Sequence, residues 1–459
     1  MRHNISQHDI TAEKGFLLSR NQYDKNGRCV FELWFKSETG IYQLHIKDQK
    51  ATCFSLSRNK TQLKTLIAAN NLKCDVVDLE LKNFKSDPCV VLYCDSLRDY
   101  QKLRRICDEY QIELLEHDIK PVDRYLMERF IKGSAVFNGY YDANDNQLAS
   151  STIKTLSTPK VSACEYQVAF TTLSIDIECD ELGNLYSIGL YSNNLFDGIE
   201  YKKVLYNTKG VEEKVRKALN HNHEYTDWCE NEAELLLRFV ELIQVLNPDI
   251  LIGWNFIKFD IRVLVQVSER LNIKLNLGRD KSELRFLDGT RDGEALYPDK
   301  TYIAGRVVLD GIEVMRNATY HFQSFSLNNV AREILSDQKL IQEDSNLTKL
   351  EQIKTDYRFH PHKLAEYNLH DCVLVYKIFT QEKLIEYLVT RTELTGLELE
   401  RVGGSVAAFT NLYLPHVHRK GWIAPNLVNI EDYVHSPGGF VMESIPGIQL
   451  VTKQSPNWR

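Results

Sequence analysis

The stretch Thr171-Thr172-Leu173-Ser174-Ile175-Asp176-Ile177-Glu178 decides how this chain is interpreted, because apolar and polar side chains alternate along it. Alternation with a period of two predicts a β-strand in which residues at i and i+2 share a face. Asp176 and Glu178 therefore project together, while Ile175 and Ile177 point into a core. Two neighbouring carboxylates repel each other unless a cation lies between them. Hard oxygen ligands suit Mg²⁺ or Mn²⁺, although two solvated acids at a strand end would give the same D-x-E pattern.

A second acidic position follows the short apolar run Ile250–Gly253, which predicts a buried parallel strand. Asp260 lies where that strand is expected to pass into a helix over 260–271. This is the carboxyl end of the sheet, where ligands of α/β proteins gather. An Asp at such a place is also a common helix N-cap, and the two roles are compatible.

A third acidic position lies in Tyr367-Asn368-Leu369-His370-Asp371. On a helix, Tyr367 and Asp371 are four residues apart and share a face. A packed tyrosine beside a surface acid would produce the same spacing. Each of the three motifs is weak alone, but their order along the chain is informative.

Further patterns predict the elements around these motifs. The expected strands cover 31–35, 89–93, 171–177, 185–191, 250–253 and 306–310, and the expected helices cover 98–110, 232–246, 260–271, 327–335 and 363–380. From residue 171 onward, two leading strands followed by alternating helices and strands favour an α/β domain on a mixed sheet. Residues 145–165 are rich in Ser, Thr, Asn and Asp, which predicts a linker or a domain junction.

Composition sets broad limits. A chain of 459 residues is too long for one hydrophobic core and suggests two to four domains. No secretory signal or run of about 18 apolar residues is visible, so we expect a cytoplasmic protein without a membrane span. The ten cysteines form no CxxC pair and are interpreted as reduced, mostly buried residues. A net charge of −7 gives no overall basic footprint, so any nucleic-acid surface must be local.

The ordered set D-x-E, N-x-x-x-F-D and Y-x-x-x-D resembles the three motifs of the DnaQ-like proofreading exonucleases, whose fold is ribonuclease H-like. The resemblance implies that four acids bind metal, namely Asp176, Glu178, Asp260 and Asp371. It also implies that Tyr367 orients the attacking water. Asn255 and Phe259 correspond to contacts that shape a groove for single-stranded DNA.

The chemistry implied by this resemblance is hydrolysis of a phosphodiester with two divalent ions, Mg²⁺ or Mn²⁺, about 3.5–4 Å apart. Asp176 would bridge the two ions. Glu178 and Asp371 would hold the ion nearer the attacking water, and Asp260 would hold the other, directly or through water. No covalent nucleophile is required.

The similarity extends beyond the motifs to family B DNA polymerases, in particular their bacterial polymerase II branch. The stretches that carry it are Arg124–Phe130, Leu173–Glu178, Ile252–Asn255, Leu277–Asp280, Ser324–Leu327, Gly403–Phe409 and Ser436–Met442. In the last of these, Ser436, Gly438 and Gly439 match a linker whose backbone approaches DNA. A simple Pro-Gly turn would also explain that sequence.

The resemblance implies an α/β and α+β multidomain protein that acts in DNA replication or repair. We expect a mixed α/β N-terminal domain (1–150), a ribonuclease H-like 3′–5′ exonuclease domain (151–372), and a helical linker with an incomplete start of the polymerase palm (373–459). The expected location is the bacterial cytoplasm, at the nucleoid. The expected partner is DNA, as a single-stranded 3′ end or a primer–template.

The C-terminal sequence departs from the family, since no Asp or Glu follows Glu443. We therefore expect the palm aspartates and the sliding-clamp peptide of full-length members to be missing, and no primer extension by this chain. A catalytically inactive DNA-binding remnant and a ribonuclease of the same fold remain alternatives. Convergence of Asp176, Glu178, Asp260 and Asp371 within metal-bridging distance distinguishes an enzyme from a remnant.

Overall fold

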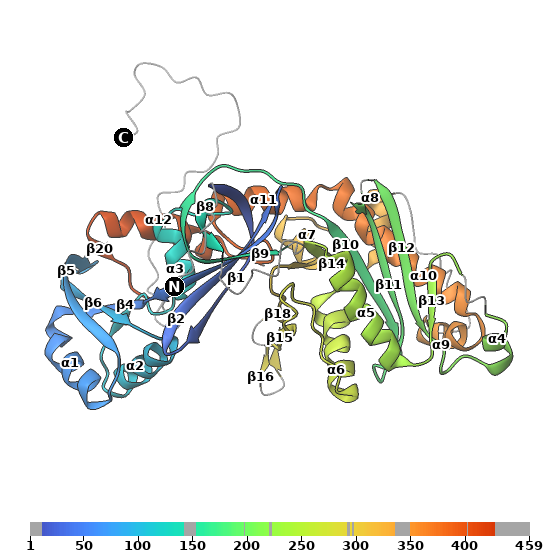
Figure 1. Ribbon diagram of the computed structural model, residues 1–459, viewed down its shortest axis with the longest axis horizontal. Coiled ribbons are helices and arrows are strands. Elements are labelled where there is room, and N and C mark those ends of the chain that lie inside the picture. Colours follow the sequence, from blue (N-terminus) through green and yellow to red (C-terminus); the bar gives the residue numbers. More distant parts are fainter. Residues whose placement is uncertain are drawn as a thin grey trace, which may run out of the picture.

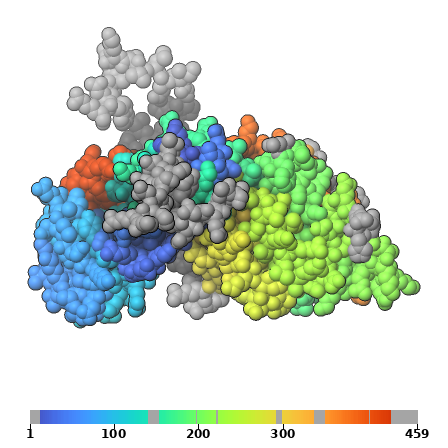
Figure 2. Space-filling view, viewed as in Figure 1, coloured from blue at the N-terminus to red at the C-terminus, as the bar shows by residue number. Residues whose placement is uncertain are grey.

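The computed structural model describes residues 12–141, 153–196, 198–219, 223–291, 294–295, 298–335, 349–401 and 403–426. In Figure 1 the N-terminal strands, in blue, lie at one end, and the sheet that carries Asp176, in green and yellow, lies at the other. Figure 2 shows the same two regions as opposite ends of an elongated surface. The orange and red helices of the C-terminal half run between them (Figure 1).

The sheet that carries Asp176 has six strands in the order β13-β12-β11-β10-β14-β19. Strand β10 pairs antiparallel with β11 and parallel with β14, and β19 extends the parallel side. The bounds are β10 Thr172–Cys179, β11 Leu185–Phe196, β12 Ile199–Asn207, β13 Thr226–Cys229, β14 Ile250–Gly253 and β19 Val307–Asp310. The predicted mixed sheet is confirmed, and β12 and β13 add two strands beyond β11.

Helices cover both faces of this sheet. Leu173, Ile175 and Ile177 lie in one apolar core with α5 (Glu232–Leu246) and α6 (Arg262–Leu271). The polar side of β10 faces α10 (Pro361–Gln381), which packs on β10, β11 and β12 next to α8 (Leu327–Leu335). The alternation along β10 therefore separates an apolar face from the face that carries the acids.

Both ends of helix α5 lie where the sequence predicts them. The Asn231 side chain caps the helix by accepting a hydrogen bond from the Glu234 N–H, and Asn247 terminates it in a left-handed conformation with φ of 47°. Asn247 and Pro248 then lead directly into β14. This short connection fixes where β14 ends, and so where the residues that follow it lie relative to β10.

The N-terminal strands form a closed barrel in the order β1-β2-β3-β9-β8. The bounds are β1 Glu13–Lys25, β2 Arg28–Ser37, β3 Gly40–Gln49, β8 Ser134–Tyr141 and β9 Ile153–Ala163. Of the two predictions for 145–165, a linker or a domain junction, the linker is wrong for 153–163, because β9 pairs with both β3 and β8. The polar residues of β9 are tolerated because none of them is buried, and Thr158, Lys160 and Ser162 are exposed. This strand lies beyond residue 150, so the barrel uses chain on both sides of that position.

A second N-terminal sheet has the strand order β20-β5-β6-β4-β7 and packs against α1 (Lys60–Ala69) and α2 (Leu97–Glu109). The bounds are β4 Ala51–Leu56, β5 Cys74–Asn83, β6 Pro88–Cys94, β7 Leu114–Leu115 and β20 Trp422–Ile423. Because β20 pairs with β5, the chain returns to the N-terminal region after α10.

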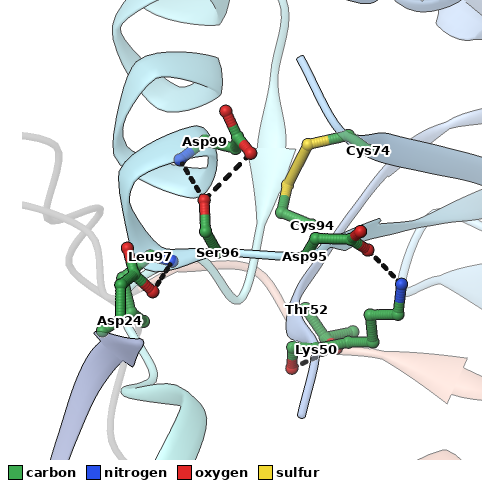
Figure 3. The surroundings of a disulfide bond; sticks show 9 residues. All are labelled: Asp24, Lys50, Thr52, Cys74, Cys94, Asp95, Ser96, Leu97 and Asp99. Carbon is green, nitrogen blue, oxygen red and sulfur yellow. Dashed lines mark hydrogen bonds and ion pairs between the residues drawn. A yellow bond between two sulfur atoms is a disulfide. The ribbon is translucent and has the colours of Figure 1, made fainter. Parts of the chain in front are cut away.

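A disulfide in this sheet corrects the prediction that all cysteines are reduced. Cys74 and Cys94 are bonded, and Figure 3 shows the bond beside the N-terminus of α2. The two residues are directly opposed on β5 and β6, with Cα atoms 4.1 Å apart, a cross-strand relationship that CxxC counting does not detect. The remaining eight cysteines are free, and all but Cys164 are buried.

Further helices join these regions. They are α3 (Pro121–Glu128), α4 (Glu213–Lys217), α7 (Gly311–Asn317), α9 (Lys349–Phe359), α11 (Leu384–Thr395) and α12 (Ser405–Arg419). Short strands β15 (Arg285–Leu287) and β18 (Lys300–Tyr302) pair with each other, as do β16 (Thr290–Arg291) and β17 (Glu294–Ala295). Among the residues described, no helix is long and apolar enough to cross a membrane.

Candidate metal centre

Three acids from distant parts of the sequence meet on the polar face of β10. Asp176 and Glu178 come from β10 and Asp371 from α10, and each offers an oxygen within 4.8 Å of the others. Glu178 and Asp371 are buried, at 8% and 1% exposure, and Asp176 is partly buried. Strand alternation places the first two, and the packing of α10 on β10 delivers the third.

The donor set fits a divalent cation. A Mg²⁺–oxygen bond is about 2.0–2.1 Å long, so two oxygens on one ion lie up to about 4.2 Å apart. Because the carboxylate oxygens already lie within 4.8 Å of one another, the side chains need to move little to bind one ion together or to hold two ions between them. Carboxylate oxygens are also the ligands that Mg²⁺ and Mn²⁺ prefer. The three residues can therefore hold a metal where the sequence predicted one.

Asp260 lies next to this group but outside the set of three. It belongs to a short π-helical segment, η3 (Ile257–Ile261), between β14 and α6. Its Oδ1 accepts a 3.1 Å hydrogen bond from the backbone N–H of Ile177, and it is 2% exposed. It does not occupy the N-cap of α6, which is Ile261. Burial, and then the charge of Asp176, raise the pKa of Asp260 well above its ordinary value.

Tyr367 lies one turn before Asp371 on α10 and is 1% exposed. Burial raises its pKa well above the ordinary tyrosine value, and Asp371, Glu178 and Asp176 raise it further. The hydroxyl therefore stays protonated and can donate a hydrogen bond beside the acids. The Lys349 ammonium, at the start of α9, lies 5.7 Å from the centre of the Tyr367 ring.

The two residues expected to shape a groove for single-stranded DNA lie at the surface after β14. Asn255 is exposed with φ of 58°, and Phe259 is 44% exposed although it is a large apolar residue. The turn depends on Gly253, because a Cβ there would lie 2.6 Å from the Phe256 ring and 2.9 Å from the Ile175 carbonyl oxygen. Ser436, Gly438 and Gly439 lie outside the residues that the structure describes.

Two polar residues at the site were missed by sequence reasoning. The Asn368 side chain donates a 2.7 Å hydrogen bond to Asp176 Oδ2. Its spacing of three residues from Asp371 on the same helix is a signal that could have identified it.

The second residue is Asp310, at the end of β19, which accepts hydrogen bonds from the backbone N–H groups of Ile257 and Ile312. Burial raises its pKa to about 6.

The known proteins that this chain resembles are DNA polymerases. The family described as DNA polymerase family B, exonuclease domain, matches residues 112–330. DNA polymerase II of Escherichia coli K12 is 33% identical over 440 residues, which is 95% of this chain and 52% of that protein. The DNA polymerase delta catalytic subunit of Glycine max is 30% identical over 213 residues, 43% of this chain and 18% of that protein.

A solved structure is also similar. The family B DNA polymerase of the hyperthermophilic archaeon Pyrobaculum calidifontis superposes with a TM-score of 0.67 at 15% identity, over 91% of this chain and 52% of that one. At this identity the likeness concerns the fold alone. The chain spans about half the length of the bacterial relative and of this structure. The family match ends before α10, so the placement of Tyr367 and Asp371 rests on the geometry described above.

Proposed function

We propose that this chain, whose residues 112–330 match the exonuclease domain of family B DNA polymerases, removes nucleotides from single-stranded 3′ ends of DNA with the help of divalent metal ions. The observation that carries the proposal is the meeting of Asp176, Glu178 and Asp371 within 4.8 Å. These acids come from two elements that are far apart in sequence, so their convergence is not a local accident of composition.

We propose distinct roles for the residues of this centre. Asp176, Glu178 and Asp371 hold the ions, and Asp260 contributes to the second one directly or through water. Such ions, when bound, supply positive charge at the phosphodiester and make a water molecule a better nucleophile. Tyr367 keeps its proton and so orients the attacking water as a hydrogen-bond donor rather than as a base.

Asn255 and Phe259 are proposed to hold the terminal nucleotides. Phe259 exposes an aromatic ring on which a base can stack, a contact typical of proteins that bind single strands. The 3′ end of a primer–template, frayed from its template, is the substrate that fits this arrangement and a role in replication or repair. We propose that the protein acts on nucleoid DNA in the bacterial cytoplasm, and a clamp contact stays a prediction for longer family members.

The test uses the purified chain with single-stranded DNA labelled at the 3′ or the 5′ end, with Mg²⁺ or with EDTA. We expect early release of the 3′ label as a mononucleotide and a stepwise ladder from the 5′-labelled strand, in Mg²⁺ only. Glu178→Ala, which removes one of the three acids, is the inactive control. Glu181→Ala removes an exposed acid nearby that pairs with Lys354, and it should keep full activity.

The outcomes separate the alternatives. DNA binding without cleavage in Mg²⁺ or Mn²⁺ would indicate an inactive DNA-binding remnant. Faster cleavage of an RNA strand of the same sequence would indicate a ribonuclease. Loss of the 5′ label first would contradict the proposed polarity.

A further inference from the structure

The side chain of Asn368 connects α10 to both strands that lie beneath the candidate metal centre. Its Nδ2 donates to Asp176 Oδ2 at 2.7 Å, and its Oδ1 accepts from the Ser187 hydroxyl at 2.9 Å. Asn368 and Ser187 are both fully buried. A buried amide with both ends paired has one fixed position, whereas an exposed amide would sample several.

The chemistry of the partners also fixes which way the amide points. An ionised carboxylate can only accept hydrogen bonds, so the NH₂ end of Asn368 must face Asp176. The oxygen end then faces Ser187, whose hydroxyl can donate to it. Turning the amide over would place two oxygens against each other at Asp176. A hydroxyl can donate or accept, so the acid sets the orientation of the amide, and the bond from Ser187 holds the amide in place.

Two small residues on strand β11 allow α10 to approach this closely. Ser187 and Gly189 are the cross-strand partners of Glu178 and Asp176, respectively. A Cβ on Gly189 would lie 2.8 Å from Cys372 Sγ and 3.1 Å from Asn368 Cγ, which is too close for a real side chain. The two β11 residues opposite the acids are therefore small, and the space that they leave is taken by the Asn368 amide.

We propose that Asn368, held by Ser187, is a positioning residue that fixes the Asp176 carboxylate before a divalent ion binds. The inference rests on the proposed function and adds two residues to its machinery. Repulsion between like charges favours rotation of Asp176 away from the other acids, and removing the amide would take away one donor that opposes this rotation. A hydrogen-bond donor both restrains that rotation and offsets part of the repulsion. Residues that orient metal ligands in this way typically change metal affinity or activity about 10–100-fold when mutated.

The experiment measures Mn²⁺ binding without DNA, by calorimetry or by the electron paramagnetic resonance signal of free Mn²⁺, and the Mg²⁺ dependence of DNA cleavage. We expect Asn368→Ala to weaken Mn²⁺ binding about 10–100-fold and to raise the Mg²⁺ concentration for half-maximal cleavage by a similar factor. Ser187→Ala should shift both quantities in the same direction by less, because it loosens the amide without removing it.

Asn207→Ala is the matched control. Asn207 is a buried asparagine of the same sheet, and its side chain donates to the Leu185 carbonyl rather than to an acid. The Asn207→Ala substitution should lower the melting temperature in EDTA, while the Mn²⁺ affinity stays at the wild-type value. A purely structural role for Asn368 would give the same pattern as Asn207→Ala, and that result would overturn the inference.

Two safeguards keep the test decisive. If Asn368→Ala does not fold, Ser187→Ala decides, and unchanged Mn²⁺ affinity in that variant would overturn the inference. If the wild-type chain neither binds Mn²⁺ nor cuts DNA, the proposed function itself fails. If wild type does both and Asn368→Ala matches it in both, only the role of Asn368 fails.

Discussion

The backbone N–H of Ile177 donates a 3.1 Å hydrogen bond to the carboxylate of Asp260. Ile177 is the residue between Asp176 and Glu178, so this bond ties the segment after β14 to the peptide that joins the two acids. Asp260 is thereby fixed relative to β10 without being one of the three acids that lie within 4.8 Å of one another. The sequence motif D-x-E thus supplies two side chains and one backbone donor to the same small region.

The first prediction concerns Glu178. Glu178→Ala should reduce DNA cleavage about a hundredfold or more, since the loss of a proposed metal ligand would remove several kcal/mol of charge stabilisation. Its melting temperature in EDTA should equal or exceed that of wild type, because the change also removes a buried, repelling carboxylate. Cleavage assays and thermal melts measure the two effects. A clean preparation of Glu178→Ala that cuts at the wild-type rate would remove this residue from the site.

Asp176→Ala should be equally inactive but less stable than Glu178→Ala in EDTA. The reason is that its loss leaves the buried Asn368 amide without the acceptor it has at 2.7 Å. An unpaired buried polar group costs about 1–3 kcal/mol, which opposes the gain from reduced repulsion. Equal melting temperatures of the two variants would contradict this difference.

Much of the domain that carries Asp176 follows from local sequence patterns. Period two along residues 171–177 predicts both the strand and the shared face of its acids, and periodicity with the Asn247-Pro248 ending predicts α5 to the residue. Tyr367 and Asp371 share a helix face because they are four residues apart on α10. Such patterns state which face of an element is buried but not which element covers it. The convergence of Asp371 with β10 therefore needed the structure, or a family resemblance, to be known.

The features that sequence reasoning missed depend on partners far away in the chain. Strand β9 pairs with β3 through contacts such as Ile153 with Ile41, and nothing local in a Ser- and Thr-rich segment indicates them. Cys74 and Cys94 meet only because β5 and β6 pair in one register. Asn368 was not singled out because its contact with Asp176 depends on how α10 packs on β10, and its spacing from Asp371 was the one local signal.

Tyr367 provides a second test of the mechanism. Tyr367→Phe should slow cleavage about 10–150-fold, as expected for loss of one hydrogen bond to a charged or polarised group, with Mn²⁺ affinity unchanged. Because burial and the nearby acids raise the pKa of Tyr367, its hydroxyl stays protonated through the working range. The pH–rate profiles of the two proteins should therefore have the same shape below about pH 10. A basic limb present in wild type and lost in Tyr367→Phe would mean that the tyrosine acts as a base.

The fourth prediction concerns the buried ion pair at the start of β14. Arg279 Nη2 and Asp249 Oδ1 are 2.7 Å apart, and both side chains are almost fully buried. Burial alone would raise the pKa of Asp249, but Arg279 and then Lys36 outweigh it and lower the pKa. Asp249→Ala should destabilise the protein by about 3–5 kcal/mol, because an unpaired charge stays buried. Urea unfolding at neutral pH measures the change.

The matched control for this pair is Glu213→Ala. Glu213 and Lys217 form an exposed pair at i and i+4, so its loss should change stability by no more than about 0.5 kcal/mol. Since the pKa of Asp249 is lowered in the folded state, the wild-type advantage over Asp249→Ala should persist above the ordinary aspartate pKa and shrink as the pH falls below it. An advantage that is constant down to pH 3 would contradict the ion-pair explanation.

The last prediction concerns His418, which joins α12 to the N-terminal region. Its Nδ1 lies 2.5 Å from Glu128 Oε1 and its Nε2 lies 2.8 Å from Glu116 Oε1. Carboxylates only accept hydrogen bonds, so both ring nitrogens must carry protons and the ring must be charged. Burial opposes that charge, yet the two acids prevail and raise the pKa of His418. Arg124 and Arg419 face the same acids and compete for them.

The sign of the pH dependence follows from this raised pKa. The stabilisation is complete below the ordinary histidine pKa of about 6.5 and is lost as the pH rises through the higher folded value. Wild type should therefore melt at a higher temperature than His418→Gln. The difference between the two melting temperatures should be largest near pH 6 and should narrow steadily toward pH 9. His416→Gln, on the same helix with its ring against Phe130, is the control and should show no such trend. An NMR titration of ¹³C-labelled histidine measures the pKa directly, and a value for His418 at or below 6.5 would show that the two acids do not hold a charged ring.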